Sequence, residues 1–442
     1  MTRRYFGTDG IRGRAGETPI TAEFAGKLGR ALVKVLGVDR PVIAIGRDTR
    51  ASGPMLEEAL ARGIISAGGD VRLLGVLPTP GVAAYVVENG LAAGAVISAS
   101  HNPAQDNGIK FFSGDGFKLP DETESAIEEQ LDAPAGEVTP GTIRQVEDAA
   151  DRYVAHALKS WPAGFSLRGL KIAVDCANGA SYVTTPKALR ALGADARVFH
   201  DSPDGFNINA DCGSTVSGEI SRLVRETGAT AGLSHDGDAD RLLLCDETGD
   251  PLDGDELLAM AGLDLLRRGE LAGKTVVATV MSNLGLDEAI EQAGGQVVRT
   301  AVGDRYVLEA MRARGFVLGG EQSGHMIFLG HGTTGDGLVA ALQILRLMAE
   351  SGKPLSELRR VMPKYPQAQR AVAVKSKPAL DTVPEVRAAI AAAEQALAPR
   401  GRVLVRYSGT EPKLRILLEG REAALLEKHA DAIARAVENA LG

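Results

Sequence analysis

The sequence predicts an α/β protein with parallel sheets, because one strand, loop and helix pattern occurs three times along the chain. Short apolar runs rich in β-branched residues each lead through a polar or glycine-containing loop into a segment of helical periodicity. The three runs begin at Pro41, Leu170 and Lys274. The helices that follow end near Gly68, Gly193 and Gly294, and a new strand begins after each glycine. This order implies parallel strands joined by right-handed crossovers, whether the pattern is a true internal repeat or the ordinary rhythm of an α/β protein.

Breaks in composition divide the 442 residues into four predicted domains. A small, polar, proline-bearing stretch covers 131–142, a second break lies near 249–253, and PKYPQA at 363–368 carries two prolines after a helical run. The last segment has a different order: strand, Ala-rich helix over 383–397, strand, loop, strand and helix. We therefore predict three α/β domains and a smaller C-terminal α+β domain, at 1–150, 151–253, 254–367 and 368–442.

The composition excludes several classes of partner. A net charge of −8, with 24% charged and 44% hydrophobic residues, is typical of a folded soluble protein. It offers no broad basic surface for nucleic acid or an anionic membrane, although a local cationic cleft for a small phosphorylated ligand remains compatible with it. Three widely spaced cysteines do not form a disulfide framework or a zinc ribbon, and we find no apolar targeting or membrane segment. We expect a cytoplasmic protein.

Three aspartates at alternate positions form the most informative motif, the loop SHDGDADRLLLCDE. Asp236, Asp238 and Asp240 precede an apolar strand, and their carboxylates can converge on one hard cation. An EF-hand is excluded because its sixth position requires glycine and is Arg241 here. Three protein oxygens leave coordination positions open, which suits Mg²⁺ shared with a phosphate better than a closed calcium site. The alternative is a solvated acidic turn.

A second motif, SASHNPAQDNGIKFF, follows the apolar run GAVI. Its polar groups therefore stand at the end of a strand, where α/β sheets form their crevice. Ser100 could act as a nucleophile, with His101 as its activating base and Lys110 as a charge partner. Asn and Pro are also ordinary turn formers, so the alternative is that these residues only shape a loop.

Three further loops carry groups suited to anions or sugar hydroxyls. In RYSGTEPKLRILLEG, glycine and two hydroxyl side chains lie between two arginines, a combination that can cradle a phosphate; the residues are Arg406, Ser408, Gly409, Thr410 and Arg415. GGEQSGHMIF offers Glu321, Ser323 and His325 to sugar hydroxyls. YFGTDGIRG places Arg12 on a glycine-bounded loop with Thr8 and Asp9, where it could contact an anion. Each loop taken alone could equally be an ordinary polar turn.

Taken in this order, the five loops resemble those of the α-D-phosphohexomutase superfamily, and within it most closely the bacterial phosphoglucosamine mutases. The resemblance covers nearly the whole chain. The family motifs SHNP, DGDxDR, GExSGH and RxSGTEPxxR are all intact, at 100–103, 236–241, 320–325 and 406–415. Gln322 in GEQSGH, the opening YFGTDGIRG and the stretch TVMSNLGL point to the glucosamine branch.

The resemblance implies a four-domain phosphohexomutase architecture, in which three related mixed α/β domains and a smaller C-terminal domain surround a central cleft. It implies that Ser100 is phosphorylated and that one Mg²⁺ is held by Ser100, Asp236, Asp238 and Asp240. The implied reaction interconverts glucosamine 6-phosphate and glucosamine 1-phosphate through a 1,6-bisphosphate, which also serves as activator, and it feeds UDP-N-acetylglucosamine synthesis. A homodimer is compatible with what is seen among relatives.

The same resemblance assigns roles to the remaining side chains. Arg241 and Arg12 place positive charge beside the reacting phosphate, and a proton is carried by Lys110 or, second, by His101. The sugar is held by Glu321, Ser323 and His325, and the distant phosphate by the 406–415 loop. Two alternatives stay open: a phosphomannomutase or phosphoglucomutase, and a non-catalytic sugar-phosphate sensor.

Overall fold

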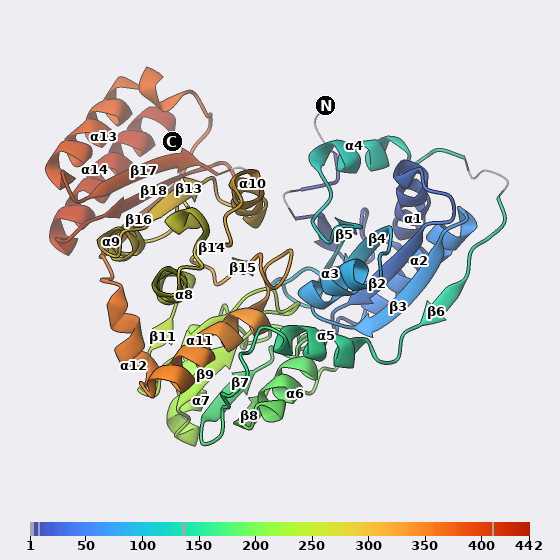
Figure 1. The fold of residues 1–442 in the computed structure, drawn as a ribbon. Helices are drawn as coiled ribbons and strands as arrows, with labels where there is room; N and C mark the ends of the chain where they lie inside the picture. Colours follow the sequence, from blue (N-terminus) through green and yellow to red (C-terminus); the bar gives the residue numbers. More distant parts are fainter. Residues whose placement is uncertain (1–3, 8, 135–137, 409–410) are drawn as a thin grey trace.

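The computed structural model describes residues 4–7, 9–134, 138–408 and 411–442, and these form four sheets. Figure 1 shows four units placed along an arc, with the N-terminal unit at one end and the C-terminal unit at the other. The first three units are layers of helices and sheet, and the fourth is a small sheet with two long helices beside it (Figure 1). This arrangement confirms the predicted fold class.

The first unit contains a six-stranded sheet in the order β1-β5-β4-β2-β3-β6. Its strands are β1 (Ile11–Arg14), β2 (Val42–Arg47), β3 (Asp70–Val76), β4 (Ala93–Ile97), β5 (Asp106–Ser113) and β6 (Ile143–Gln145). Its helices are α1 (Ala22–Leu36), α2 (Gly53–Ser66), α3 (Thr79–Glu88) and α4 (Asp121–Glu129). Strands β4, β2, β3 and β6 are parallel, whereas β5 and β1 pair antiparallel at one edge. The loops after β2 and β4 therefore leave the sheet at the same end.

The second unit has five strands in the order β11-β10-β9-β7-β8. They are β7 (Lys171–Asp175), β8 (Asp195–Phe199), β9 (Ala231–Ser234), β10 (Leu243–Cys245) and β11 (Pro251–Leu252). The helices are α5 (Ala149–Leu158), α6 (Thr184–Ala191) and α7 (Ser217–Thr227). Strands β8, β7 and β9 are parallel, and β10 and β11 follow antiparallel. The connection from β9 to β10 is the aspartate loop.

The third unit has four strands in the order β13-β12-β14-β15, of which the first three are parallel. They are β12 (Thr275–Thr279), β13 (Gln296–Thr300), β14 (Leu318–Gly320) and β15 (Met326–Phe328). The α-helices are α8 (Gly254–Arg268), α9 (Leu284–Gln292), α10 (Asp304–Arg314), α11 (Gly337–Ser351) and α12 (Leu355–Leu358), and the 3₁₀ turns are η1 (Ala272–Lys274) and η2 (Arg359–Val361). Helix α8 starts at a capping box, in which Asp253 and Glu256 each bond the other's backbone N–H.

The fourth unit is an antiparallel sheet in the order β16-β18-β17. It consists of β16 (Gln367–Ala373), the turn η3 (Leu380–Thr382), α13 (Pro384–Leu397), β17 (Arg402–Tyr407), β18 (Lys413–Glu419) and α14 (Ala423–Leu441). This order confirms the strand, helix, strand, strand, helix prediction for the C-terminal segment. The hairpin from β17 to β18 carries the predicted phosphate loop.

The repeated pattern is confirmed at its strands and at its helix ends. The three predicted strands are β2, β7 and β12, and each is an interior strand of its sheet with a neighbour on both sides. The glycines after the helices adopt left-handed backbone angles, with φ of 90° at Gly68, 91° at Gly193 and 80° at Gly294, which a side chain would strain. The antiparallel strands differ from the parallel sheets that this pattern predicts. Strands β10, β11 and β15 are only two or three residues long and show no periodicity, and β1 and β5, of four and eight residues, lie outside the repeated pattern.

The buried apolar residues show how the units are joined. One continuous core includes Val82, Ile172 and Leu258, from three successive units, whereas the fourth unit has a separate core. The fourth unit is attached through the segment before β16, where the Asn283 side chain exchanges two hydrogen bonds with the Tyr365 backbone, at 2.9 and 3.1 Å. No helix in the described ranges combines the length and the apolar character that a membrane span requires.

Candidate active site

Ser100 lies in the loop that follows β4, almost fully buried, with an exposed fraction of 1%. Its backbone is left-handed, with φ of 53°, a conformation that costs a residue with a side chain on the order of 1 kcal/mol. The Ser100 hydroxyl donates a 2.6 Å hydrogen bond to Asp236 Oδ2, and its oxygen lies 3.4 Å from Nδ1 of His101. The structure therefore brings the predicted nucleophile to the predicted metal loop.

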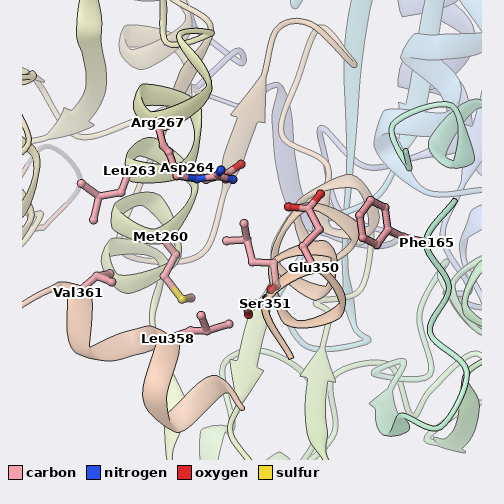
Figure 2. Close-up of a pocket in the computed structure, with 10 residues that line it drawn as sticks. Phe165, Met260, Leu263, Asp264, Arg267, Glu350, Ser351, Leu358 and Val361 are labelled. Atoms are coloured by element: carbon pink, nitrogen blue, oxygen red, sulfur yellow. Dashed lines mark hydrogen bonds and ion pairs between the residues drawn. The ribbon is translucent and has the colours of Figure 1, made fainter. Parts of the chain in front are cut away.

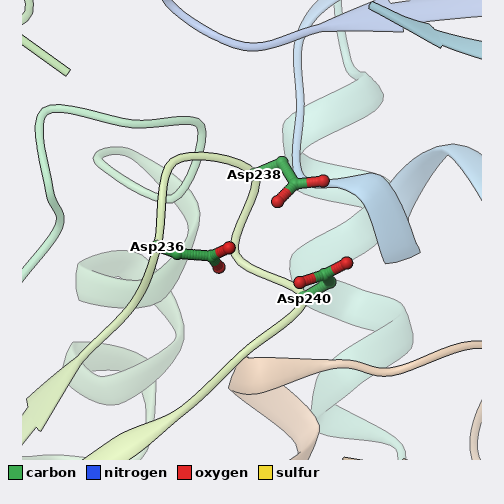
Figure 3. Close-up of side chains that lie close together, drawn as sticks. All are labelled: Asp236, Asp238 and Asp240. Carbon is green, nitrogen blue, oxygen red and sulfur yellow. The ribbon is translucent and has the colours of Figure 1, made fainter. Parts of the chain in front are cut away.

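Asp236, Asp238 and Asp240 point toward one another from the turn between β9 and β10 (Figure 3). All three are buried, and one ligand oxygen from each lies within 4.8 Å of the others. Among the described residues, Asp238 Oδ1 and Asp240 Oδ1 are buried without a hydrogen-bond partner. Burial, followed by the charges of Asp240 and Asp238, raises the pKa of Asp236 to about 7. Three converging carboxylates with free oxygens fit a hard divalent cation such as Mg²⁺.

Positive side chains border this triad. Lys110, on β5, donates a 2.7 Å hydrogen bond to Asp238 and lies 3.7 Å from Asp240. Burial disfavours its ammonium form, but the neighbouring carboxylates, Asp238 first, outweigh this and raise the pKa of Lys110 above its ordinary value. Arg241 places Nε 4.0 Å from Asp236, and the Arg12 guanidinium pairs with Asp9 and donates to the carbonyl of Ala99 at 3.3 Å. A phosphate on Ser100 would thus meet cations from two units.

The loop between β14 and β15 joins the same centre. His325 places Nδ1 3.6 Å from Asp240 and Nε2 3.4 Å from Asp304. Burial opposes its charged form, but Asp240 and Asp304 outweigh it and raise the pKa of His325 to about 9. Glu321 accepts a 3.0 Å hydrogen bond from the Gly303 backbone, and Ser323 is exposed. The predicted sugar loop therefore contacts the aspartate loop through His325 and exposes Ser323 in its middle.

The predicted phosphate loop lies apart from these groups. Arg406 and Arg415 are cross-strand partners on β17 and β18 and line a hollow of about 220 Å³ together with Met281. Arg415 pairs with Glu411 at 2.8 Å, and the buried Ser408 hydroxyl accepts from the Glu411 backbone at 3.3 Å. Among the described residues, no hydrogen bond or ion pair joins this loop to the other four. Gly409 and Thr410 lie outside the described residues, as does Thr8.

A larger hollow of about 490 Å³ lies elsewhere, between α8, α11 and α12 (Figure 2). Its lining includes Phe165, Met260 and Leu358. The predicted site residues that the structure describes do not contribute to it. Size alone therefore does not locate the chemistry, which is identified by the converging charged groups.

The sequence analysis missed several residues of this centre. Asp48 and Arg50, directly after β2, are fully buried beneath the Ser100 loop, and Asn209 reaches the same loop from the second unit. Lys118 joins Asp9 to Asp304, which links the first unit to the third. The signal for Asp48 and Arg50 was present, because GRDTR places polar residues right at the end of a buried central strand.

Comparisons with known proteins agree with this architecture. Four domain families described under "Phosphoglucomutase/phosphomannomutase" match the chain: alpha/beta/alpha domain I over residues 3–137, domain II over 151–249, domain III over 253–365 and the C-terminal domain over 370–436. Among solved structures, a phosphoglucomutase/phosphomannomutase family protein from Burkholderia thailandensis has a TM-score of 0.83 at 25% identity and covers 98% of this chain and 97% of its own. N-acetylphosphoglucosamine mutase from Aspergillus fumigatus, solved with GlcNAc-6P and magnesium, has a TM-score of 0.71 at 20% identity, covering 100% of this chain and 96% of its own.

Curated relatives are more similar in sequence. A phosphoglucosamine mutase from Syntrophotalea carbinolica is 51% identical over 453 residues, which span 100% of this chain and 99% of the relative. A phosphoglucosamine mutase from Anaeromyxobacter dehalogenans is 51% identical over 458 residues, with 100% of both chains covered. At this identity over the full length, and with all four domains matched, the chain belongs to the phosphoglucosamine mutase family of the α-D-phosphohexomutases.

Proposed function

We propose that the protein interconverts glucosamine 6-phosphate and glucosamine 1-phosphate, using a phosphoserine at Ser100 and glucosamine 1,6-bisphosphate as the intermediate. The observation that carries this proposal is the 2.6 Å hydrogen bond between Ser100 and Asp236, within a buried triad of carboxylates. A hydroxyl beside a triad that suits a divalent cation is an arrangement that supports phosphoryl transfer, because the cation can stabilise charge on the transferred group. We infer the identity of the sugar, glucosamine, from the family relationship.

The reaction consists of two transfers. In the first, the bond between phosphorus and Ser100 Oγ breaks, phosphorus bonds to O1 of the 6-phosphate, the O1 proton passes to Oγ, and the product is the 1,6-bisphosphate. The bisphosphate then turns around in the site. In the second transfer, Oγ bonds to the phosphorus of the 6-phosphate, the bond from that phosphorus to O6 breaks, and the Oγ proton passes to O6. This sequence releases the 1-phosphate and restores the phosphoserine.

Asp236, Asp238, Asp240 and the phosphorylated Ser100 would hold the Mg²⁺. When bound, the metal supplies positive charge that stabilises the charge developing on the phosphoryl oxygens. The chain adds its own cations, because Arg241, Arg12 and Lys110 border the same position. Such fixed charges stabilise the transition state without having to reorganise.

We propose that Lys110 carries the proton between the sugar hydroxyl and Oγ, and we rank His101 second for this role. Both side chains lie next to the reacting oxygen or its partners: His101 Nδ1 is 3.4 Å from Oγ, and Lys110 is 2.7 Å from Asp238. A carrier in such a position must lie within hydrogen-bond reach of the proton in the substrate complex.

The substrate is held at two places. We propose that Arg406, Ser408, Gly409, Thr410 and Arg415 bind the phosphate that does not react, and that Glu321, Ser323 and His325 bind the sugar. Binding energy at the remote phosphate would then fix the reacting hydroxyl in line with phosphorus. Each of the four proposed domains, at 1–150, 151–253, 254–367 and 368–442, would contribute at least one of the five loops, and the first would contribute two.

The cellular setting follows from the same proposal. The reaction supplies glucosamine 1-phosphate for UDP-N-acetylglucosamine synthesis in the cytoplasm, and a sugar 1,6-bisphosphate acts as activator. A homodimer is the oligomeric state that we propose, with no nucleic-acid or membrane partner.

A phosphorus NMR time course tests the reaction and its substrate together. Purified protein with Mg²⁺ and a trace of the matching 1,6-bisphosphate is given glucosamine, glucose or mannose 6-phosphate at equal concentration. We expect glucosamine phosphate to interconvert at least about tenfold faster, equivalent to about 1.4 kcal/mol of transition-state discrimination. Faster turnover of mannose or glucose phosphate would overturn the substrate assignment, and no turnover of any sugar would favour a sensor.

A further inference from the structure

Arg50 is a fully buried guanidinium whose hydrogen bonds go to the backbone of the Ser100 loop. An arginine side chain has five N–H donors. In this structure Nε donates to Asp48 at 2.9 Å, and the remaining four N–H groups face carbonyl oxygens of the loop. These carbonyls belong to Ser100 at 3.0 Å, Asn102 at 2.8 Å, Asp106 at 3.0 Å and Pro103. Every donor of Arg50 is therefore used, and most of them hold the loop.

Asp48 links Arg50 to Ser98. Its Oδ2 accepts from Arg50 Nε and, at 2.6 Å, from the hydroxyl of Ser98. The Ser98 hydroxyl in turn accepts the backbone N–H of Ser100 at 2.9 Å. Both backbone polar groups of Ser100 are thus fixed by one buried network, the N–H through Ser98 and the carbonyl through Arg50.

The second unit closes the network. The amide of Asn209 donates to the carbonyls of Ser100 at 2.9 Å and Asn102 at 3.1 Å, two of the four that Arg50 also binds. Thr49 donates to the Asn178 carbonyl at 2.5 Å, so the segment carrying Arg50 is itself bound to the second unit. The loop is held on both sides, although its central residue has an unfavourable backbone angle.

We propose that Arg50 and Ser98, bridged by Asp48, are positioning residues that together hold Ser100 in its left-handed conformation and so direct Oγ at Asp236. Arg50 touches no reacting atom in this arrangement. It acts through the carbonyls of the loop, and a lysine, with three donors on one nitrogen, does not replace a planar group that serves four of them. This inference rests on the proposed function, because the position of Oγ matters only if Ser100 exchanges phosphate.

The experiment compares Arg50→Lys with Arg346→Lys, a matched control. Arg346 is also buried and pairs with Asp264 and Glu350, away from the Ser100 loop. For each full-length protein we would measure the melting temperature, kcat and KM with Mg²⁺ and glucosamine 6-phosphate, and the rate at which glucosamine 1,6-bisphosphate phosphorylates Ser100, followed by intact mass. We expect Arg50→Lys to lower kcat and the phosphorylation rate by about 30-fold or more, equivalent to about 2 kcal/mol. KM should change by less than about threefold, because the remote phosphate loop is untouched.

Ser98→Ala gives a second test, and it changes no charged side chain. It removes the hydroxyl that accepts the Ser100 N–H and leaves the Arg50 pair in place. Because the buried N–H then lacks its acceptor, we expect a melting temperature a few degrees below that of wild type and kcat lowered about fivefold or more. If Arg50→Lys does not fold, this variant decides. Wild-type kcat in a folded Arg50→Lys protein or in Ser98→Ala would overturn the inference alone, as would an equal loss in Arg346→Lys. Absence of turnover by the wild type would overturn the proposed function and this inference together.

Discussion

The Ser100 hydroxyl donates a 2.6 Å hydrogen bond to Asp236, a residue 136 positions later in the sequence. The donor belongs to the loop after β4 in the first unit, and the acceptor follows β9 in the second. The backbones of the two loops are also close to each other, because a Cβ atom on Gly237 would lie 2.6 Å from the Ser100 carbonyl oxygen. The proposed phosphoserine and the carboxylate triad therefore lie in contact across the first two units.

Ser100→Ala should abolish both phosphoenzyme formation and turnover. The variant removes the oxygen to which the phosphoryl group bonds, so we expect kcat to fall by about 10³-fold or more. Intact mass after incubation with the 1,6-bisphosphate and the phosphorus NMR time course would measure the two effects. Ser351→Ala, at the exposed end of α11, serves as control. Near wild-type activity with stable phosphate in Ser100→Ala would show that another residue accepts it.

Asp238→Asn and Asp240→Asn should weaken divalent-metal binding and lower kcat by about 10²-fold or more, because each removes a charged side chain that we propose as a ligand of the cation. Chelation with EDTA should have the same effect on the wild type and be reversed by Mg²⁺. Binding would be followed by the electron paramagnetic resonance of Mn²⁺. Asp195→Asn is the matched control, an exposed carboxylate of the same unit paired with Arg197. Unchanged Mn²⁺ affinity in both triad variants would contradict the site.

Arg415→Ala and Arg406→Ala should reduce kcat/KM mainly through KM. A hydrogen bond to a charged group contributes about 1.5–3 kcal/mol, so the expected loss is about 10- to 100-fold per arginine. Steady-state kinetics with the 6-phosphate as variable substrate would measure it. Arg387→Ala, exposed on α13 of the same unit, should leave both constants unchanged. A fall in kcat at constant KM would instead place these arginines at the reacting phosphate.

Asp255 should make the folded protein less stable as pH rises. Burial, and then the charge of Asp253, raises the pKa of the Asp255 carboxyl from 3.8 to about 7. The folded state therefore retains a proton that the unfolded chain has lost, and the free energy of unfolding falls between about pH 4 and pH 7. Asp255→Asn still accepts the 2.8 Å hydrogen bond from the Asn283 N–H and does not ionise.

The melting temperature of Asp255→Asn should exceed that of wild type at pH 8, by a few degrees, and the difference should shrink toward pH 4. Differential scanning calorimetry at several pH values would measure this. Asp195→Asn should show no such trend, since that carboxylate is exposed. A difference that is the same at all pH values, or that grows toward pH 4, would mean that the Asp255 carboxyl is ionised in the folded protein.

The sequence predicted those parts of the fold and the site that short-range patterns specify. Strands β2, β7 and β12 were evident as apolar runs. The convergence of the three aspartates was predictable because residues at alternate positions share one short loop. Motif resemblance then related loops that lie hundreds of residues apart. No local pattern indicates that His325 lies between Asp240 and Asp304, because that placement depends on how the second and third units pack.

Arg50 illustrates why the rest of the site was not found. An arginine after a strand is most often an exposed residue, and its sequence neighbours do not reveal the Ser100 loop 50 positions away. Only the tertiary structure shows that four carbonyls of that loop converge on one guanidinium. Lys118 is a similar case, because its partner Asp9 lies far before it in the sequence and its partner Asp304 lies far after it.

The separate core of the C-terminal unit has a consequence for the intermediate. The 1,6-bisphosphate must turn end for end between two transfers, so one contact with it has to be released and made again while the centre around Ser100 stays intact. The arginine pair is carried by a unit with its own core, attached at Asn283 and Tyr365, whereas a continuous core joins the three units that carry Ser100 and the aspartates. The proposed remote-phosphate contacts and the proposed reacting groups thus belong to separately packed parts of the molecule. The first can be released and made again while the second stay in place.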